Sequence, residues 1–232
     1  MFKTIRRSMP GLLLLAGALA LAVTFSGQAR QQPAQGERTG YDPLSLVEQG
    51  RARQIALADA SVSALLTGAA RTELLLVERH EESKAVYALG SWPRRADVLI
   101  YLYDTDTLLS AVVNLTAGGV DQVQTAQQVQ PPLTPAETDL AGQLALADPA
   151  AGAALREEYR RATERDLGSA DQLRVYARVF WADAMPDVDL GEAASCGLHR
   201  CAQLLFSVEP NHRLSALPIV DLSTQTVTLL PR

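Results

Sequence analysis

Both cysteines of this 232-residue chain lie close together, with one of its three histidines between them, in the segment Cys196-Gly-Leu-His199-Arg-Cys201. Cysteine pairs in exported proteins usually form disulfides, and the N-terminus predicts export, so we expect Cys196 to be bonded to Cys201. Thiolate and imidazole groups also suit Cu(I) and zinc, which makes a copper or zinc site of Cys196, His199 and Cys201 the alternative. Structural zinc takes four protein ligands, and only three are local. A redox pair is the third interpretation, although the Cys-x-x-Cys spacing is absent.

An acidic stretch that contains Asp183, Asp187, Asp189 and Glu192 precedes the cysteines. Carboxylate-rich loops can bind Ca²⁺, but this one lacks the spacing of a calcium loop, which favours a solvated connection. Loops on rigid scaffolds carry binding residues, so we expect a binding loop here with Trp181, Asp187 and Asp189 on it. A core position is the alternative for Trp181.

No arrangement of residues in the sequence indicates a catalytic site. The Gly-x-Ser-x-Gly motif of serine hydrolases is absent, and so is a His-x-His pair. The formal net charge is -5, which repels phosphate backbones, and aromatic residues that could stack on bases are scarce. We therefore expect no enzyme activity, no resident cofactor and no nucleic-acid partner.

The first half of the folded sequence predicts one helix followed by strands. Asp42-Pro43 is a helix-start signal, and Leu44–Leu66 carries a broad apolar stripe. Asp104-Thr-Asp106 is a short polar turn between two apolar runs, which indicates a hairpin. The expected strands are Thr72–Glu78, Lys84–Leu89, Asp97–Tyr103, Thr107–Leu115 and Val120–Val129.

The second half repeats this order after a proline-rich break. Thr134-Pro135-Ala-Glu137 is a capping box that opens a helix. That helix is expected to reach Ala147, to be interrupted at Asp148-Pro149 and to continue through Ala150–Thr163. The expected strands are Gln172–Trp181, Ala202–Val208, Leu214–Leu222 and Thr226–Leu230.

Short internal matches indicate that the two halves are a repeat. Gln54–Asp59 matches Gln143–Asp148, and Val112–Thr116 matches Ile219–Ser223, in the same order in both halves. We expect the α+β class, with two similar units that each pack a helix on an antiparallel sheet. The first unit would span 41–132 and the second 133–232.

The N-terminus has the parts of an export signal. Basic residues precede an apolar run, Gly11–Phe25, and small residues follow it up to Ala29. Residues 1–29 are therefore expected to be a signal peptide or, if uncut, a membrane anchor, and the polar residues 30–40 a flexible spacer. The expected location is extracytoplasmic, periplasmic or secreted, with membrane contact only through an uncleaved N-terminal segment.

Three segments carry a resemblance to a known family. Arg95–Asp104, Ser110–Thr116 and Gln130–Glu137 resemble the small N-terminal domains of copper amine oxidases, called N2 and N3. The resemblance implies an α+β fold and an extracytoplasmic setting. The family's copper ligands, quinone-forming tyrosine and catalytic aspartate belong to a large β-sandwich domain. This chain has no Asn-Tyr-Asp or Asn-Tyr-Glu motif, so no catalytic residue is carried over.

Three functional hypotheses follow. The first is a non-catalytic binding or accessory module that contacts a protein partner. The second is a copper- or zinc-binding protein that uses Cys196, His199 and Cys201. The third is a non-catalytic subunit of a separately encoded amine oxidase.

Overall fold

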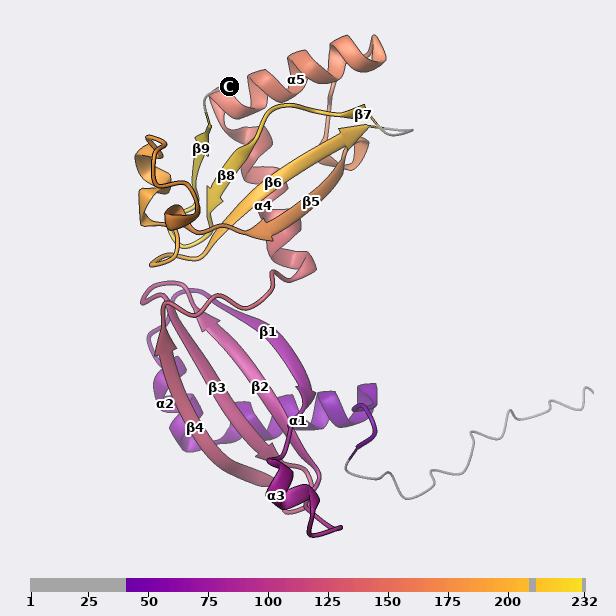
Figure 1. The fold of residues 1–232 in the computed structure, drawn as a ribbon, viewed down its shortest axis with the longest axis vertical. Coiled ribbons are helices and arrows are strands. Elements are labelled where there is room, and N and C mark those ends of the chain that lie inside the picture. Colours follow the sequence, from indigo (N-terminus) through magenta and orange to yellow (C-terminus); the bar gives the residue numbers. More distant parts are fainter. Residues whose placement is uncertain (1–40, 209–211, 231–232) are drawn as a thin grey trace, which may run out of the picture. The chain divides into compact units, whose positions relative to one another are not determined.

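The computed structural model describes residues 41–208 and 212–230. The expected signal segment, 1–29, and spacer, 30–40, lie outside the described residues. The described chain is α+β, with two antiparallel sheets of four and five strands and helices packed on them (Figure 1). In the described part, no helix combines the length and the apolar character needed to span a membrane.

The first helical region consists of two helices, α1 (Leu46–Ala58) and α2 (Ala60–Leu66). The prediction of one continuous helix that starts at Asp42-Pro43 is wrong at both points. Ser45 is the N-cap and forms a capping box with Glu48. The helix then breaks at Asp59, whose carboxylate accepts hydrogen bonds from the first backbone amides of α2.

The second helical region has the same construction. Helix α4 (Pro135–Ala147) starts at the predicted Thr134–Glu137 capping box, and α5 (Pro149–Thr163) follows it. Asp148 lies between them and caps α5 through the amides of Ala150 and Ala151. Asp59 and Asp148 have nearly the same backbone angles, with ψ of 135° and 134°. The sequence match that ends at these two aspartates therefore marks the same structural break.

Sheet order in the first half follows the chain, β1-β2-β3-β4. Ile100 lies opposite Leu109 in the register of the predicted hairpin. These side chains face α1, where the buried Ala52 and Ala56 allow the helix to pack closely on the sheet. The strands are β1 (Thr72–Arg79), β2 (Arg95–Leu102), β3 (Thr107–Asn114) and β4 (Gly119–Gln127).

One predicted strand is wrong, because the chain forms the short helix α3 (Lys84–Tyr87) where Lys84–Leu89 was expected to be extended. Ser83 caps this helix by accepting a hydrogen bond from the Val86 amide. The Tyr87 ring stacks on Tyr41, with ring centroids 5.1 Å apart. This segment has the alternating apolar residues of a strand, but packing between aromatic rings holds it in a single helical turn.

The second sheet pairs its strands in the order β5-β6-β8-β9, and β7 adds to β6. Its inner face presents Leu204 and Phe206 to the buried Ala141 and Ala145 of α4. The strand expected at Leu214–Leu222 begins only at Pro218, and β7 was not predicted. The strands are β5 (Arg174–Val179), β6 (Cys201–Val208), β7 (His212–Arg213), β8 (Pro218–Asp221) and β9 (Thr226–Leu229).

The final turns of the two sheets also correspond. Asn114 at the end of β3 accepts a hydrogen bond from the Ala117 amide, and Asp221 at the end of β8 accepts from the amides of Ser223 and Thr224. Four residues after each of these polar side chains the backbone has positive φ, 76° at Gly118 and 62° at Gln225. The internal repeat of the sequence is therefore a repeat of structure.

Candidate functional site

The connection between β5 and β6 folds over the outer face of the second sheet. It contains two short 3₁₀ helices, Ala182–Ala184 and Gly191–Ser195. Its buried Leu190 and Ala193 pack with Ile219 of the sheet in a small separate core. The segment from Trp181 to Arg200, which we call the disulfide loop, therefore has a fixed structure of its own.

Cys196 and Cys201 form a disulfide and are both buried. Gly197 follows Cys196 with a φ of 107°, and a Cβ placed there would lie 3.0 Å from the Trp181 ring, so a larger residue would be strained. Both sulfurs are used in the bond and are not available as thiolate ligands. Among the described residues, no group of three or more His, Cys, Asp or Glu could hold a metal ion.

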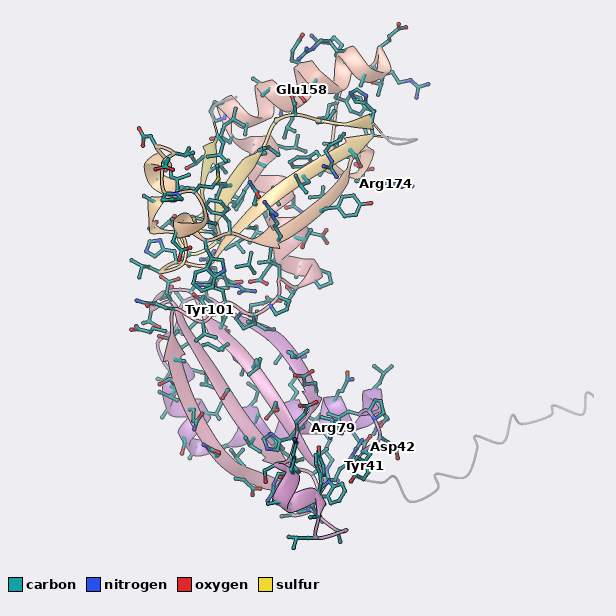
Figure 2. The ribbon with its side chains drawn as sticks, in the orientation of Figure 1. Tyr41, Asp42, Arg79, Tyr101, Glu158 and Arg174 are labelled. Carbon is teal, nitrogen blue, oxygen red and sulfur yellow. A yellow bond between two sulfur atoms is a disulfide. The ribbon has the colours of Figure 1, made fainter. Side chains whose placement is uncertain are left out.

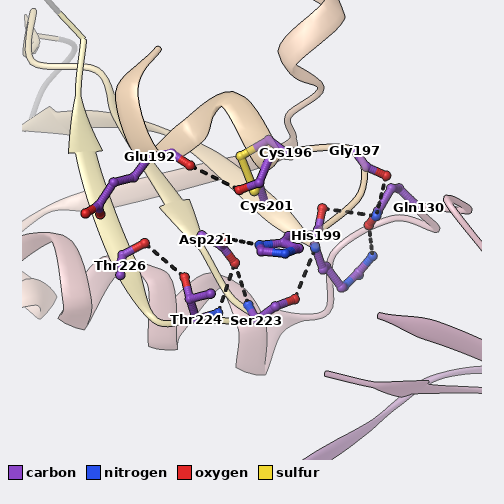
Figure 3. Close-up of a disulfide and its surroundings, with 12 residues drawn as sticks. Gln130, Glu192, Cys196, Gly197, His199, Cys201, Asp221, Ser223, Thr224 and Thr226 are labelled. Atoms are coloured by element: carbon purple, nitrogen blue, oxygen red, sulfur yellow. Dashed lines mark hydrogen bonds and ion pairs between the residues drawn. A yellow bond between two sulfur atoms is a disulfide. The ribbon is translucent and has the colours of Figure 1, made fainter. Parts of the chain in front are cut away.

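His199 lies between Asp221 of β8 and Asp106 of the turn between β2 and β3. Figure 3 shows the Asp221 carboxylate beside the imidazole. Its Nδ1 is 2.6 Å from Oδ2 of Asp221, and its Nε2 is 3.9 Å from Oδ2 of Asp106. The hydrogen bond to Asp221 raises the pKa of His199, and partial burial opposes that shift. Asp221 is itself held by the amides of Ser223 and Thr224. The site thus favours a protonated imidazole.

Asp106 links the turn between β2 and β3 to the second sheet. Its Oδ1 accepts hydrogen bonds from the Tyr101 hydroxyl at 3.1 Å and from the Arg200 amide at 3.3 Å. The Ser223 hydroxyl donates to the same oxygen. Burial is the main cause that raises the pKa of the Tyr101 hydroxyl, and the negative charge of Asp106 raises it further. The Tyr101 hydroxyl therefore stays protonated and donates. Asp106 is thus bound by a residue of the first sheet and by two residues that flank strands of the second.

Next to Asp106 lies a buried ion pair between Arg200 and Glu137. The Arg200 side chain is fully buried and binds both carboxylate oxygens of Glu137, one of them at 2.8 Å. Burial would raise the pKa of Glu137, but Arg200 outweighs it and the net shift is downward. The Tyr103 hydroxyl donates to the same carboxylate at 2.7 Å. The guanidinium also donates to the carbonyls of Pro131 and Pro132 and to the side-chain oxygen of Gln130, at the junction of the two halves.

We call the set Tyr101, Tyr103, Asp106, Glu137, His199, Arg200, Asp221 and Ser223 the clasp. It contains serine, histidine and aspartate, but the Ser223 hydroxyl donates to Asp106 and not to the imidazole. A nucleophilic serine needs the imidazole as its hydrogen-bond acceptor. The geometry of the clasp therefore joins the two sheets and does not activate a nucleophile.

The predicted site residues are only partly brought together. His199 lies between the two bonded cysteines, Cys196 and Cys201, and belongs to the clasp. Trp181 is half-buried and packs against Gly197. Asp187 and Asp189 are exposed and are not part of the clasp, and Asp189 accepts a hydrogen bond from the Gly191 amide.

Sequence reasoning missed most of the clasp. The available signal for Asp221 was its match to Asn114 in the repeat. Asp106 lay in the predicted hairpin turn, and Glu137 lay in the predicted capping box. No local pattern in the sequence marked Arg200.

Comparison with known proteins supports the fold. No family model matches the chain, and no curated protein matches it. Among solved structures, a copper-containing benzylamine oxidase from Hansenula polymorpha matches with a TM-score of 0.51 and 17% sequence identity. The match covers 84% of this chain and 30% of the oxidase chain, which corresponds to the N-terminal domains without the catalytic domain. The resemblance predicted from the sequence is thus confirmed for the fold.

Proposed function

We propose that this chain is a non-catalytic extracytoplasmic binding or accessory module that contacts a protein partner. The observation that carries the proposal is the clasp, because the polar groups that could do chemistry are bonded to one another across the two sheets. A joined pair of small α+β units is a rigid scaffold, and loops and sheet faces on such scaffolds are common binding surfaces. The fold likeness to the N-terminal part of an oxidase is consistent with this role.

The disulfide and the N-terminal sequence support the extracytoplasmic location. Disulfides persist in oxidising compartments and are rare where thioredoxin keeps thiols reduced. The mature chain is proposed to begin at Arg30, after cleavage behind Ala29. An intact mass of the natively isolated chain tests both points, since a chain of full length with free thiols would contradict them.

The partner is tested by isolating the full chain, with a C-terminal tag, from the cell envelope and the medium of its host after cross-linking. We expect one protein to be enriched at a fixed ratio and to bind the purified chain directly. The purified chain alone is expected not to oxidise benzylamine, with or without added copper. Turnover of an amine by the chain alone, or purification as a single species with no bound protein, would contradict the proposal.

A second candidate is a non-catalytic subunit of a separately encoded amine oxidase. The specific observation in its favour is the match to 30% of an oxidase chain. In this case the enriched partner would itself oxidise amines, and removal of this chain would change the partner's activity or stability. A partner with no oxidase activity would favour the general accessory role.

A further inference from the structure

Strand β4 forms one edge of the first sheet. It pairs with β3 on one side, and among the described residues no backbone hydrogen bond is made on its other side. Figure 2 shows the side chains of β4 along this edge. The amides and carbonyls that point away from β3 are therefore unpaired within the described part of the chain. An edge strand of this kind can accept a further strand.

The other edge strands have features that discourage pairing, and most of β4 has none. Strand β1 has three charged residues and a bulge at Leu75. Strand β5 has two arginines, and β7 and β9 have only two and four residues. Charge, bulges and short length are common protections of a sheet edge. In β4 the single charge and the bulge are both at Asp121, so residues 122–127 are regular, uncharged and, except for Val123, exposed.

The two faces of β4 restrict how a second copy of this strand can pair with it. Val123 lies opposite the buried Ala111 and packs on the core beneath α1, and Thr125 is on the same face of the strand. Gln124 points to the opposite face. Residues that lie opposite each other in antiparallel strands share a face of the sheet. A two-fold axis between two copies of β4 therefore passes through a residue and not between two residues.

An axis through Gln124 makes the strand complementary to itself. Val123 then faces Thr125 of the second copy, and this pair of β-branched side chains occurs twice. Gln124 faces its own counterpart, and because an amide side chain is both a donor and an acceptor, the two can bond to each other. No like charges meet, since residues 122–127 carry none. An axis through Thr125 would instead place Val123 opposite the polar Gln127, which is less favourable.

We propose that two copies of this chain associate through β4, antiparallel about a two-fold axis at Gln124, so that their first sheets form one continuous sheet. Such a contact is isologous, and each favourable pair away from the axis is used twice. Helices α1 and α2 pack on one face of the first sheet, so the helices of both copies lie on the same side of the joined sheet (Figure 1). The inference goes beyond the proposed function and does not depend on it.

Self-association is measured by sedimentation velocity on the natively purified chain over a series of concentrations, and we expect a reversible dimer. Gln124→Lys and Gln124→Glu each place like charges opposite each other, and each is expected to weaken the dimer by about two- to fivefold, with unchanged thermal unfolding. An equimolar mixture of the two variants is expected to associate more tightly than either alone, because opposite charges then meet. Gln143→Lys, at an exposed glutamine of α4, is the matched control and is expected to leave the dimer unchanged.

Cysteine cross-linking tests the register. Both native cysteines are buried in their disulfide, so an introduced cysteine is the only free thiol. Under mild oxidation Gln124→Cys is expected to give a disulfide-linked dimer, because side chains directly opposite each other have Cβ atoms about 4.5–5.5 Å apart. Thr125→Cys is expected to link more slowly, because its counterpart then lies diagonally across the pair.

A chain that stays monomeric at every concentration would overturn the proposal. A dimer that both charge variants at Gln124 leave unchanged would also overturn it, because the contact would then lie elsewhere. Faster cross-linking of Thr125→Cys than of Gln124→Cys would show that the register is wrong. If the chain is monomeric and an isolated natural partner still binds it, this inference is wrong while the proposed function stands.

Discussion

Arg200 and Glu137 form a fully buried ion pair between residues 63 positions apart in the chain. Glu137 caps helix α4, and Arg200 lies beside the disulfide at the entry to β6. The same carboxylate receives the Tyr103 hydroxyl from the first half. One carboxylate therefore joins a helix start, the disulfide loop and the first sheet.

Breaking this pair on one side is expected to destabilise the fold strongly. Arg200→Met or Glu137→Gln should each lower the free energy of unfolding by about 3–5 kcal/mol, because each leaves buried polar groups without partners. Denaturant unfolding measures the loss. The double variant is expected to lose less stability than the sum of the two single losses. The control variant Arg161→Ala, which removes an exposed ion pair, is expected to lose about 0.5 kcal/mol or less. Single variants within about 1 kcal/mol of wild type would show that the pair is not closed in solution.

His199 is expected to make stability depend on pH. Its pKa is raised in the folded state by Asp221, so its contribution is complete below the unfolded value of about 6.5. That contribution is lost as the pH rises through the higher folded pKa. The difference in unfolding free energy between wild type and His199→Gln should therefore shrink as the pH rises above about 6.5.

Asp221→Asn serves as the control for this effect. It removes the charged acceptor, and the difference between Asp221→Asn and the double variant with His199→Gln should vary little with pH. A difference between wild type and His199→Gln that stays constant from acid to alkaline pH would contradict the prediction.

The disulfide is expected to stabilise the chain and to exclude metal from the loop. The natively isolated chain should be two hydrogens lighter than the mass calculated for residues 30–232 with free thiols. Replacing Cys196 and Cys201 together by serine should cost about 2 kcal/mol, because the closed loop is short. Copper or zinc uptake at one equivalent by the unreduced chain, measured by native mass spectrometry, would restore the metal hypothesis.

The two equivalent aspartates provide a matched pair of variants. Asp59→Ala and Asp148→Ala should each lower stability by about 1 kcal/mol, because each removes the cap of the following helix. Asparagine at either position should restore most of the loss. If neither alanine variant differs from wild type in thermal or denaturant unfolding, the caps do not contribute as the structure indicates.

Local features of this fold could be predicted from the sequence. The capping box at Thr134–Glu137 and the hairpin at Asp104–Asp106 depend on neighbouring residues, and both are confirmed. The break at Asp59 was missed because no proline marks it, unlike the break at Asp148. The helix at Lys84–Tyr87 was missed because its ring contacts with Tyr41 and Trp92 are not visible in an alternating pattern.

The site was predictable only where its residues are adjacent in sequence. The positions of Cys196 and Cys201 close together in the sequence predicted their disulfide, and His199 was singled out because it lies between them. The Asp106 and Asp221 partners of His199 are 93 and 22 residues away, so only folding reveals them. Arg200 had no signal, since a lone arginine is typical of a surface and here is fully buried.

The correspondence of Asp59 with Asp148 and of Asn114 with Asp221 shows that one plan is used twice. The two copies differ most in the connection after the first strand of each sheet. In the first copy this connection is the short helix that stacks on Tyr41, and in the second it is the disulfide loop. In a duplicated scaffold of this kind, the helix caps and sheet turns are kept in both copies, whereas the connection after the first strand diverges. The part of this connection that precedes the disulfide is then the natural place to exchange or graft a recognition loop, while His199 and Arg200 of the clasp are kept.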